Sequence, residues 1–325
     1  MNLLETFRAQ IESELVTLTQ KCKPAGLYDP IAYVLSLGGK KIRPALCMLG
    51  CSLYNKEKVS KSLYPALGLE VFHNFTLLHD DIMDGSEMRR NQPSVHKKWN
   101  DNTAILSGDA MMILAYQLIS KTPSDVLKPV LDLFSQTGLE VCEGQQYDMD
   151  FETRDDITVS DYIEMIRLKT AVLIGASLKT GAIIGGANSK EAVSLYNFGI
   201  DVGISFQLQD DWLDVFGDES TFGKNIGGDI VTNKKTFLLI TALNNLSSAG
   251  RKELQAWLDK KDFDRTEKVA AVRNLYDDAN VSNIAKNLMN EYHSAALLHL
   301  ERAGGSHDIQ EELKSFALQM MERSR

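Results

Sequence analysis

The sequence predicts an all-α protein, and three observations support this fold class. Apolar residues recur at spacings of three and four through most of the 325 residues, whereas sustained alternation with a period of two is hard to find. Only seven prolines occur and none follows Pro129, so the rest of the chain lacks this helix breaker. Hydrophobic residues make up 44% and charged residues 24% of the chain, a balance typical of globular proteins rather than disordered ones.

The predicted helices follow one another along the chain with short connections. Pro44 and Pro65 suit the first turns of two of them, because a first turn needs no backbone donor. Further on, Ser189 followed by Lys-Glu-Ala is typical of an N-cap. We expect helices near residues 2–22, 43–54, 65–84, 104–121, 125–150, 160–186, 190–216, 236–246, 250–259, 265–273, 283–303 and 308–323.

The connections carry the polar and glycine-rich sequence. The stretch 85–95 is polar and contains Pro93, and the stretch 217–233 holds four glycines, so both are predicted loops. The most apolar segment, 171–187, contains Lys179 and four glycines, which favours a buried helix over a membrane span of about 20 residues. No linker divides the chain, so a single domain over residues 1–325 is expected.

Composition and charge exclude several classes of partner. The formal net charge is −9, which disfavours nucleic acids and anionic membranes as partners because both require a basic surface. The four cysteines form no Cys-x-x-Cys pair and are expected to be reduced thiols; the spacing of Cys47 and Cys51 leaves a metal site as the less favoured alternative. Charges near the N-terminus oppose a secretory leader. A cytoplasmic protein without a transmembrane segment is expected.

Two clusters of aspartates end two of the predicted helices. The first aspartate cluster is Asp80, Asp81 and Asp84, and the second aspartate cluster is Asp210, Asp211 and Asp214. Residues four apart share a helix face, and carboxylates at a helix C-terminus are repelled by the macrodipole. At an effective dielectric constant near 20, two carboxylates about 5 Å apart repel each other by about 3 kcal/mol. A solvated helix end is the alternative for one such cluster, but its repetition indicates bound cations.

The residue types indicate which cation and which substrate these clusters bind. Carboxylates with no Cys or His at ligand spacing favour a hard cation such as Mg²⁺. This ion typically binds one or two carboxylates, and substrate phosphate completes its coordination shell. Basic residues follow each cluster along the chain, Arg89 and Arg90 after the first, and Lys224 and Lys234 after the second. The substrate is therefore expected to carry phosphate.

A third basic segment lies nearer the N-terminus, at residues 38–44, which read Gly-Gly-Lys-Lys-Ile-Arg-Pro. The two glycines allow a tight turn, after which Lys40 and Arg43 can both face one diphosphate. The segment lacks the Walker spacing, and no Gly-x-Gly-x-x-Gly follows a strand, so a nucleotide-binding fold is not indicated.

Taken in order, these motifs resemble those of the trans-isoprenyl diphosphate synthases, the polyprenyl synthetase family. The resemblance rests on Gly-Gly-Lys-x-x-Arg-Pro, Asp-Asp-x-x-Asp followed by Arg-Arg, Gly144-Gln145 with Asp148, Lys169-Thr170, Phe206-Gln207 before the second Asp-Asp-x-x-Asp, Gly223-Lys224 and Asn233-Lys234. It implies an isoprenoid-synthase-type helical bundle around a deep central cavity, with the two aspartate clusters facing each other across its mouth. It also implies Mg²⁺-dependent head-to-tail condensation of isopentenyl diphosphate with C5, C10 or C15 allylic diphosphates, by a homodimer.

The resemblance further implies a role for each site residue. About three Mg²⁺ ions would bind per active site. Asp80, Asp84 and Asp210 would bind them directly, and Asp81, Asp214 and Asp148 directly or through water. Asp211 is the remaining acid of the catalytic set. The allylic diphosphate would be held by Arg89, Lys169, Lys224 and Lys234. Isopentenyl diphosphate would be held by Lys40, Arg43, His73 and Arg90. Oxygen atoms of Lys169, Thr170 and Gln207 would face the allylic cation.

His73 has an alternative interpretation, because a lone histidine on an apolar helix is usually a core residue with a satisfied hydrogen bond. It lies seven residues before Asp80, about two helical turns, and so roughly on the same face. This position favours ligand contact.

Three residues are expected to limit product length. Phe72, Phe75 and Thr76 lie one and two turns before Asp80, which places them about 6–12 Å deeper along the helix. The family resemblance implies a short product, because Phe75 is aromatic as in short-chain synthases. Thr76 stands where a second aromatic residue would favour farnesyl diphosphate (C15), so the resemblance favours geranylgeranyl diphosphate (C20). Ordinary core packing is the alternative for both phenylalanines.

Two other functions remain open at this point. A class I terpene cyclase also ionises prenyl diphosphates with Mg²⁺, but its second metal motif normally reads Asn-Asp-x-x-Ser-x-x-x-Glu, and it has no use for Lys40 and Arg43. A non-catalytic subunit of a heteromeric synthase would typically lose aspartates, whereas this chain keeps all six.

Overall fold

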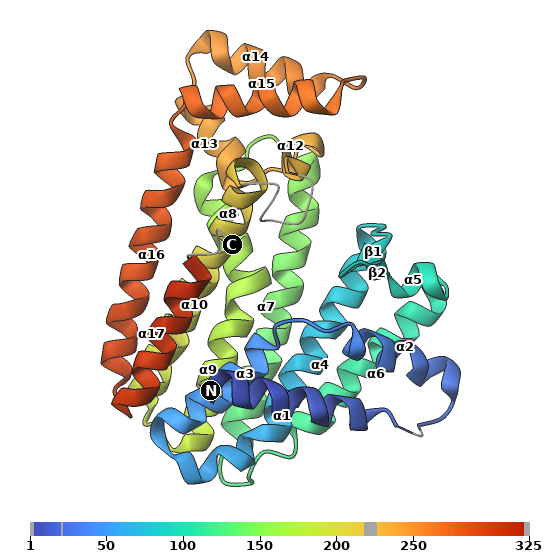
Figure 1. The fold of residues 1–325 in the computed structure, drawn as a ribbon, viewed down its shortest axis with the longest axis vertical. Helices are drawn as coiled ribbons and strands as arrows, with labels where there is room; N and C mark the ends of the chain where they lie inside the picture. The colour runs from blue at the N-terminus through green and yellow to red at the C-terminus, as the bar shows by residue number, and fades with distance from the viewer. Residues whose placement is uncertain (1–2, 21, 218–225, 322–325) are drawn as a thin grey trace. The chain divides into compact units, whose positions relative to one another are not determined.

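The computed structural model describes residues 3–20, 22–217 and 226–321, and most of these residues are helical (Figure 1). The described strands are β1 (Met88–Arg89) and β2 (Gln92–Pro93), which pair antiparallel as one short hairpin. The predicted all-α class is confirmed.

The described residues group into two compact units. Unit 1 comprises Met1–Gln136, Ala176–Tyr196 and Arg302–Leu313, and unit 2 comprises Thr137–Gly175, Asn197–Glu301 and Lys314–Arg325. The first aspartate cluster therefore belongs to unit 1 and the second to unit 2. The expectation of a single domain over residues 1–325 stays a prediction.

The helices divide between the units along the chain. Unit 1 contains α1 (Leu3–Leu18), α2 (Ala25–Ser36), α3 (Ile42–Tyr54), the 3-10 turn η1 (Lys56–Lys58), α4 (Val59–Met83), α5 (Val95–Lys98) and α6 (Asp101–Ile119). Unit 2 contains α8 (Val159–Ile166), the π-helical turn η2 (Arg167–Ala171), α12 (Gly228–Val231), α13 (Phe237–Asn245), α14 (Ser248–Asp259) and α15 (Arg265–Asp278). Residues of both units occur in α7 (Leu127–Thr153), α9 (Val172–Gly185), α10 (Ser189–Phe216), α16 (Val281–Ala303) and α17 (His307–Met321).

Helices α2 and α4 differ from the sequence expectation because burial outweighs proline. Helix α2 is not among the predicted helices, yet Pro30 lies inside it and is buried with Ile31 and Val34. Helix α4 begins at Val59 rather than near residue 65, so Pro65 lies inside the helix and not in its first turn. A proline inside a helix removes one backbone hydrogen bond, and the packing of α4 against both α3 and α6 offsets that loss.

The apolar segment predicted as one helix over 160–186 is interrupted by a π-helical turn. The run Val159–Gly185 consists of α8, η2 and α9, and by length and composition alone it could cross a membrane. However, 78% of its most apolar window is buried inside the structure, which matches the prediction of a buried helix.

Close contact between α3 and α9 explains one of the glycines in this segment. Within unit 1, a Cβ atom on Gly181 would overlap the carbonyl oxygen of Cys47, and one on Gly50 would overlap the carbonyl oxygen of Leu178. The two backbones can approach this closely only because both positions lack a side chain.

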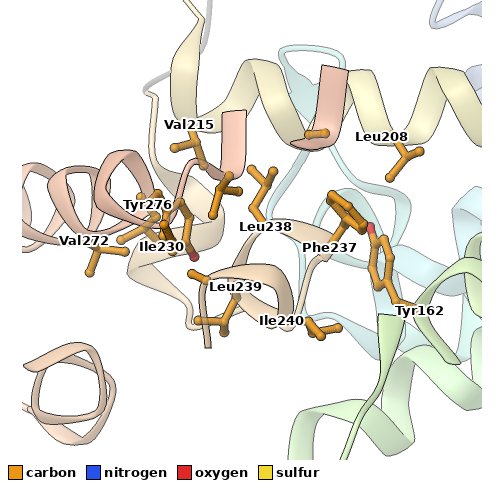
Figure 2. Close-up of a cluster of buried hydrophobic side chains, with 14 of the residues drawn as sticks. Tyr162, Leu208, Val215, Ile230, Phe237, Leu238, Leu239, Ile240, Val272 and Tyr276 are labelled. Atoms are coloured by element: carbon orange, nitrogen blue, oxygen red, sulfur yellow. The ribbon is translucent and has the colours of Figure 1, made fainter. Parts of the chain in front are cut away.

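The core of unit 2 forms around α13 (Figure 2). Six consecutive residues of this helix are buried, from Phe237 to Ala242. They pack with buried side chains of α8, α10, α12 and α15, which include Tyr162, Leu208, Val215, Ile230, Val272 and Tyr276. This core fixes the last turns of α10, on which the second aspartate cluster lies.

Asp201 in unit 2 is a partly buried carboxylate whose effect on stability depends on pH. The Asp201 side chain on α10 is 15% exposed, and burial raises its pKa to about 6. The His299 imidazole lies 3.7 Å away, beyond hydrogen-bond distance, so it offsets little of this effect.

Replacing Asp201 with asparagine is therefore expected to stabilise the protein at high pH only. The folded-state pKa exceeds the unfolded value of about 3.9, so wild-type protein loses stability as pH rises from about 4 to about 6, by about 2–3 kcal/mol. The variant should match wild type near pH 4 and exceed it above about pH 6 when urea unfolding is measured across this range. A stability difference that does not change with pH would contradict this account of Asp201.

Candidate active site

The first aspartate cluster occupies the C-terminal end of α4 in unit 1. Asp80 and Asp81 lie in its last turn and Asp84 is the C-cap, whose backbone N–H donates to the carbonyl of Asp80 at 2.9 Å. Asp84 is exposed and Asp80 is partly exposed. Their spacing of four residues places both on one side of the helix end, as predicted.

Asp81 differs from its two neighbours because it is buried in an ion pair. Its side chain accepts three hydrogen bonds from Arg89, of 2.5, 3.1 and 3.2 Å. A bidentate pair of this kind fixes the orientation of both groups. Arg89, predicted to hold the allylic diphosphate, thus lies directly beside the first aspartate cluster and is held in place by it.

The hairpin between β1 and β2 separates the two adjacent arginines. Arg90 and Asn91 form its turn, with φ of 53° and 60°, the left-handed pair that a two-residue hairpin requires. Arg89 turns toward Asp81, whereas Arg90 donates a hydrogen bond to the carbonyl of Gly38. The Arg90 guanidinium lies against Gly39, where a Cβ atom would overlap it. This turn brings Arg90 to the Gly-Gly segment.

Several cationic side chains of unit 1 converge beside that segment. We call the guanidinium groups of Arg43 and Arg90, together with the imidazole of His73, the cationic cluster. Lys41 and Arg89 lie near enough to act on His73 electrostatically. Nη1 of Arg43 lies 3.1 Å from Nε2 of His73, and because arginine can only donate, Nε2 accepts. Burial lowers the pKa of His73 well below its ordinary value, and the positive charges around it lower it further. His73 is therefore neutral at physiological pH.

Arg43 has unused hydrogen-bonding capacity. Burial lowers its pKa to about 10, so it stays charged at neutral pH. Its Nε atom is buried, and no group in the described part of the chain accepts from it. A buried donor without an acceptor is rare and points to a missing partner. Lys40, which directly follows Gly39, is exposed.

A small pocket in unit 1 joins these charged groups to apolar surface. Asp81, Arg89 and Arg90 line it together with the apolar side chains of Leu77 and Leu78. Its volume of about 10 Å³ is that of about one water molecule, so the pocket marks where these side chains meet.

The second aspartate cluster occupies the last turns of α10 in unit 2. Asp210 is partly exposed, and Asp214 accepts a hydrogen bond of 2.9 Å from the backbone N–H of Asp229. Asp211 is buried and accepts from the Tyr162 hydroxyl and, at 3.2 Å, from Nε2 of Gln207. Burial raises the pKa of Asp211 to about 7, against the opposing effect of Lys234.

The π-helical turn η2 carries the predicted Lys169 and Thr170. Nζ of Lys169 pairs with Oδ2 of Asp148 on α7 at 2.6 Å. Oγ1 of Thr170 donates to Oε1 of Gln207 at 3.4 Å. A π-helical turn is rare and often marks a functional site, because it leaves backbone carbonyls out of the regular helical pattern. Unit 2 therefore pairs Lys169 with Asp148 and Thr170 with Gln207, whereas their roles toward a substrate stay predictions.

The remaining predicted lysines lie after the second aspartate cluster. Lys234 is exposed, and its backbone N–H donates to the carbonyl of Asp229 at 2.9 Å. The preceding Asn233 has a φ of 56° and accepts from Nζ of Lys268 at 2.6 Å, which fixes the turn that presents Lys234. Lys224 lies outside the described residues.

The three predicted length-limiting residues of α4 differ in their surroundings. Phe72 is fully buried, with ring centroids 5.3 Å from Phe134 and 5.7 Å from Phe75. Phe75 is partly buried, and its ring lies 4.8 Å from that of His79. Oγ1 of Thr76 is bonded to the carbonyl of His73 at 2.8 Å. Phe72 thus has the contacts of a core residue, whereas Phe75 and Thr76 are only partly buried.

Several residues that organise the site were not identified from the sequence. Tyr162 and Asp229 hold members of the second aspartate cluster, and Glu70 pairs with Lys41 beneath the cationic cluster. Each has its partner far along the chain, for example Tyr162 and Asp211 are 49 positions apart, so helical spacing does not indicate these contacts. A tyrosine on an apolar helix face was the available hint, because a buried hydroxyl needs a partner.

The donor chemistry of the aspartates fits Mg²⁺. In the described ranges, no three His, Cys, Asp or Glu side chains are grouped closely enough to hold a metal ion. Mg²⁺ needs no such group, since it typically takes one or two carboxylates and retains water or substrate phosphate in its shell. Asp80, Asp84 and Asp210 supply hard oxygens at accessible helix ends, so the residues present are compatible with this ion.

Comparisons with known proteins agree on one family. Residues 24–276 match the family model described as Polyprenyl synthetase. A geranylgeranyl diphosphate synthase of Methanosarcina mazei is 39% identical over 72% of this chain and 72% of its own. A geranylfarnesyl diphosphate synthase of Natronomonas pharaonis is 38% identical over 68% of this chain and 70% of its own. The crystal structure of a geranylgeranyl pyrophosphate synthase superposes with a TM-score of 0.94 at 43% identity, covering 99% of both chains.

Proposed function

The chain belongs to the polyprenyl synthetase family, and from this premise we propose that it condenses isopentenyl diphosphate with allylic diphosphates to make geranylgeranyl diphosphate. Family membership makes the chain a prenyltransferase of the trans-isoprenyl diphosphate synthase type. The observation that carries the proposal is the meeting of Arg43, His73 and Arg90 beside the Gly-Gly segment. A terpene cyclase takes one diphosphate substrate and has no need of this second cationic site.

The aspartates would hold the metal ions and, through them, the allylic diphosphate. We assign Mg²⁺ binding to Asp80, Asp84 and Asp210, with Asp81, Asp214 and Asp148 acting directly or through water. Mg²⁺ would supply Lewis-acid stabilisation of the departing diphosphate. Asp211 is buried against Tyr162 and Gln207, so its part in the catalytic set is to hold Gln207.

Cationic side chains would stabilise the leaving group while the C–O bond breaks. Arg89, Lys169, Lys224 and Lys234 would hold the allylic diphosphate as negative charge builds on its bridging oxygen. The electron pair leaves with the diphosphate and an allylic carbocation forms. Thr170 and Gln207 would present oxygen atoms toward this cation, together with the carbonyl of Lys169.

The second substrate completes the reaction at the cationic cluster. Lys40, Arg43, His73 and Arg90 would hold the diphosphate of isopentenyl diphosphate, whose double bond attacks the carbocation to form the new C–C bond. A proton then leaves the condensed chain, and the released diphosphate accepts it. Neutral His73 can donate through its second ring nitrogen without repelling the neighbouring arginines.

We propose C20 as the main product, with Phe75 and Thr76 limiting the chain. Relatives of similar identity are named for two different products, geranylgeranyl and geranylfarnesyl diphosphate, so family membership alone does not fix the length. Phe75 is partly buried on α4, five residues before Asp80. Phe72 packs in the core and sets length only by supporting Phe75.

Replacing Phe75 with alanine is expected to shift the main product to longer chains, because a shorter side chain leaves room for at least one more isoprene unit. Chromatography of dephosphorylated products checks the outcome. Phe198→Leu serves as the control. Phe198 is a fully buried core residue with no assigned part in limiting the chain, so its replacement should lower the melting temperature while the product length stays unchanged. An unchanged product distribution for Phe75→Ala would remove this residue from the role.

We also propose that the protein works as a homodimer in the cytoplasm, with residues 1–325 as one catalytic domain and no nucleic acid partner. The net charge of −9 and the burial of the apolar run Val159–Gly185 support a chain that does not span a membrane. Sedimentation of the purified protein tests the dimer.

The decisive experiment for the function is incubation of the purified chain with Mg²⁺, isopentenyl diphosphate and each of the C5, C10 and C15 allylic primers. We expect a C20 diphosphate from every primer and none when EDTA replaces Mg²⁺. Hydrocarbon released without isopentenyl diphosphate would favour the cyclase alternative. Activity that appears only after a second chain is added would favour the subunit alternative.

A further inference from the structure

A buried ion pair lies beneath the cationic cluster in unit 1. Nζ of Lys41 is 3.1 Å from Oε1 of Glu70, and the two side chains are only 2% and 3% exposed. Lys41 precedes α3, whereas Glu70 lies within α4. The pair therefore joins the end of the Gly-Gly segment to the helix that carries His73 and the first aspartate cluster.

The backbone and the neighbouring groups are built around this pair. Lys41 has a φ of 43°, in the left-handed region that costs a residue other than glycine energy, and this geometry accompanies an inward-pointing side chain. The carboxylate of Glu70 also accepts from Nδ2 of Asn74 at 2.9 Å. Nζ of Lys41 lies 3.5 Å from the carbonyl of Leu35. Both charged groups are thus removed from water and hydrogen-bonded, and a buried ion pair is costly without such hydrogen bonds.

The pair also acts on the cations that face the Gly-Gly segment. The negative charge of Glu70 raises the pKa of Arg43 and of Arg90, partly offsetting the lowering caused by burial. It therefore stabilises two guanidinium groups that would otherwise repel each other while no anion is bound. Arg43 in turn contacts His73, and Arg90 holds the carbonyl of Gly38.

We propose that the Lys41–Glu70 ion pair is a positioning device for the isopentenyl diphosphate site, which orients Lys40, Arg43 and Arg90 without touching the substrate. The inference rests on the function proposed above, because it assigns the cationic cluster to that substrate. Lys41 would not bind phosphate itself, although it lies in the sequence between Lys40 and Arg43, which we assign to the diphosphate.

Stability alone does not account for the pair. Apolar residues of similar volume often stabilise a protein as well as, or better than, a buried ion pair. An ion pair is directional, however, and it can hold the turn and the two arginines in one arrangement before the anion arrives. Preorganisation of this kind lowers the ordering cost of binding.

The test is Glu70→Gln, measured with the full-length protein against both substrates. The KM for isopentenyl diphosphate should rise about tenfold or more, because Lys41 loses its partner and the arginines lose their counter-charge. The KM for geranyl diphosphate should stay within about twofold of wild type. Lys41→Arg, with Glu70 intact, keeps the charge and the ion pair and should retain most of the wild-type affinity. Equal rises in both KM values, or no rise in either, would overturn the proposal.

A double variant separates positioning from folding. Lys41→Met combined with Glu70→Met leaves no unpaired charge, so the melting temperature should recover even where a single variant is too unstable to assay. Positioning predicts that the KM for isopentenyl diphosphate stays raised in this variant. Its return to the wild-type value together with the melting temperature would show that the pair only stabilises the fold.

A control variant and a binding assay keep the result independent of the proposed reaction. Asp132→Asn breaks the exposed Lys128–Asp132 pair and should change neither KM. If wild type forms no product, the proposed function fails, but calorimetric titration with isopentenyl diphosphate and with inorganic diphosphate still decides the inference. Weaker binding by Glu70→Gln than by wild type supports it, and equal binding overturns it.

Discussion

Replacing Asp80 with asparagine is expected to lower kcat about a thousandfold or more, while the protein remains folded. Asparagine has nearly the same shape but lacks the negative charge, so the variant should bind Mg²⁺ poorly at the end of α4 and lose the stabilisation of the departing diphosphate. Asp80 is only partly buried, which limits the effect on folding. Steady-state assays with isopentenyl and geranyl diphosphate over a range of Mg²⁺ concentrations check the result.

The matched control for Asp80 is an aspartate of the same unit that lies outside the site. Asp109 is exposed on α6, and Asp109→Asn should keep wild-type kcat and Mg²⁺ dependence. Activity of Asp80→Asn within tenfold of wild type at every Mg²⁺ concentration would contradict the assignment of Asp80 as a metal ligand.

Replacing Lys169 with methionine is expected to lower kcat about 100- to 1,000-fold, the usual effect of removing one preorganised stabilising group. The ammonium group pairs with Asp148 at 2.6 Å, and the Lys169 side chain is 24% exposed, so it is held in place yet accessible to a substrate. Methionine keeps the length and apolar stem of lysine, which should preserve the π-helical turn. Single-turnover kinetics with geranyl diphosphate separate this loss from product release.

Lys235→Met is the corresponding control in unit 2. Lys235 also pairs with an aspartate, Asp155, at 2.9 Å, but no role in diphosphate binding is assigned to it. Its replacement should leave kcat nearly unchanged. If Lys235→Met lowered kcat as much as Lys169→Met, the effect would reflect general loss of positive charge rather than a specific contact.

Helical spacing predicted those parts of the site that lie on a single helix. Asp80 and Asp84 share a face because they are four residues apart, and the same arithmetic applies to Asp210 and Asp214. Lys169 and Thr170 were identified through the family resemblance, and the structure adds that they lie in a π-helical turn.

Interactions between distant segments were beyond the reach of the sequence pattern. The different directions of Arg89 and Arg90 depend on a left-handed two-residue turn, and the partner of Lys41 lies on another helix. Buried polar partners are selected by three-dimensional packing, so neither periodicity nor local propensity reveals them. Helix α2 was missed for a related reason, since burial of Pro30 and its neighbours outweighs a weak local preference.

The central claim is that aspartates of both clusters bind divalent ions together with an allylic diphosphate. It is tested most directly by a crystal structure with Mn²⁺ and a non-ionisable allylic thiolodiphosphate, in which anomalous scattering locates the metal. The account predicts ions bound by Asp80 and Asp84 and by Asp210, with diphosphate oxygens completing their coordination. Bound analogue with no anomalous signal at either cluster would contradict it.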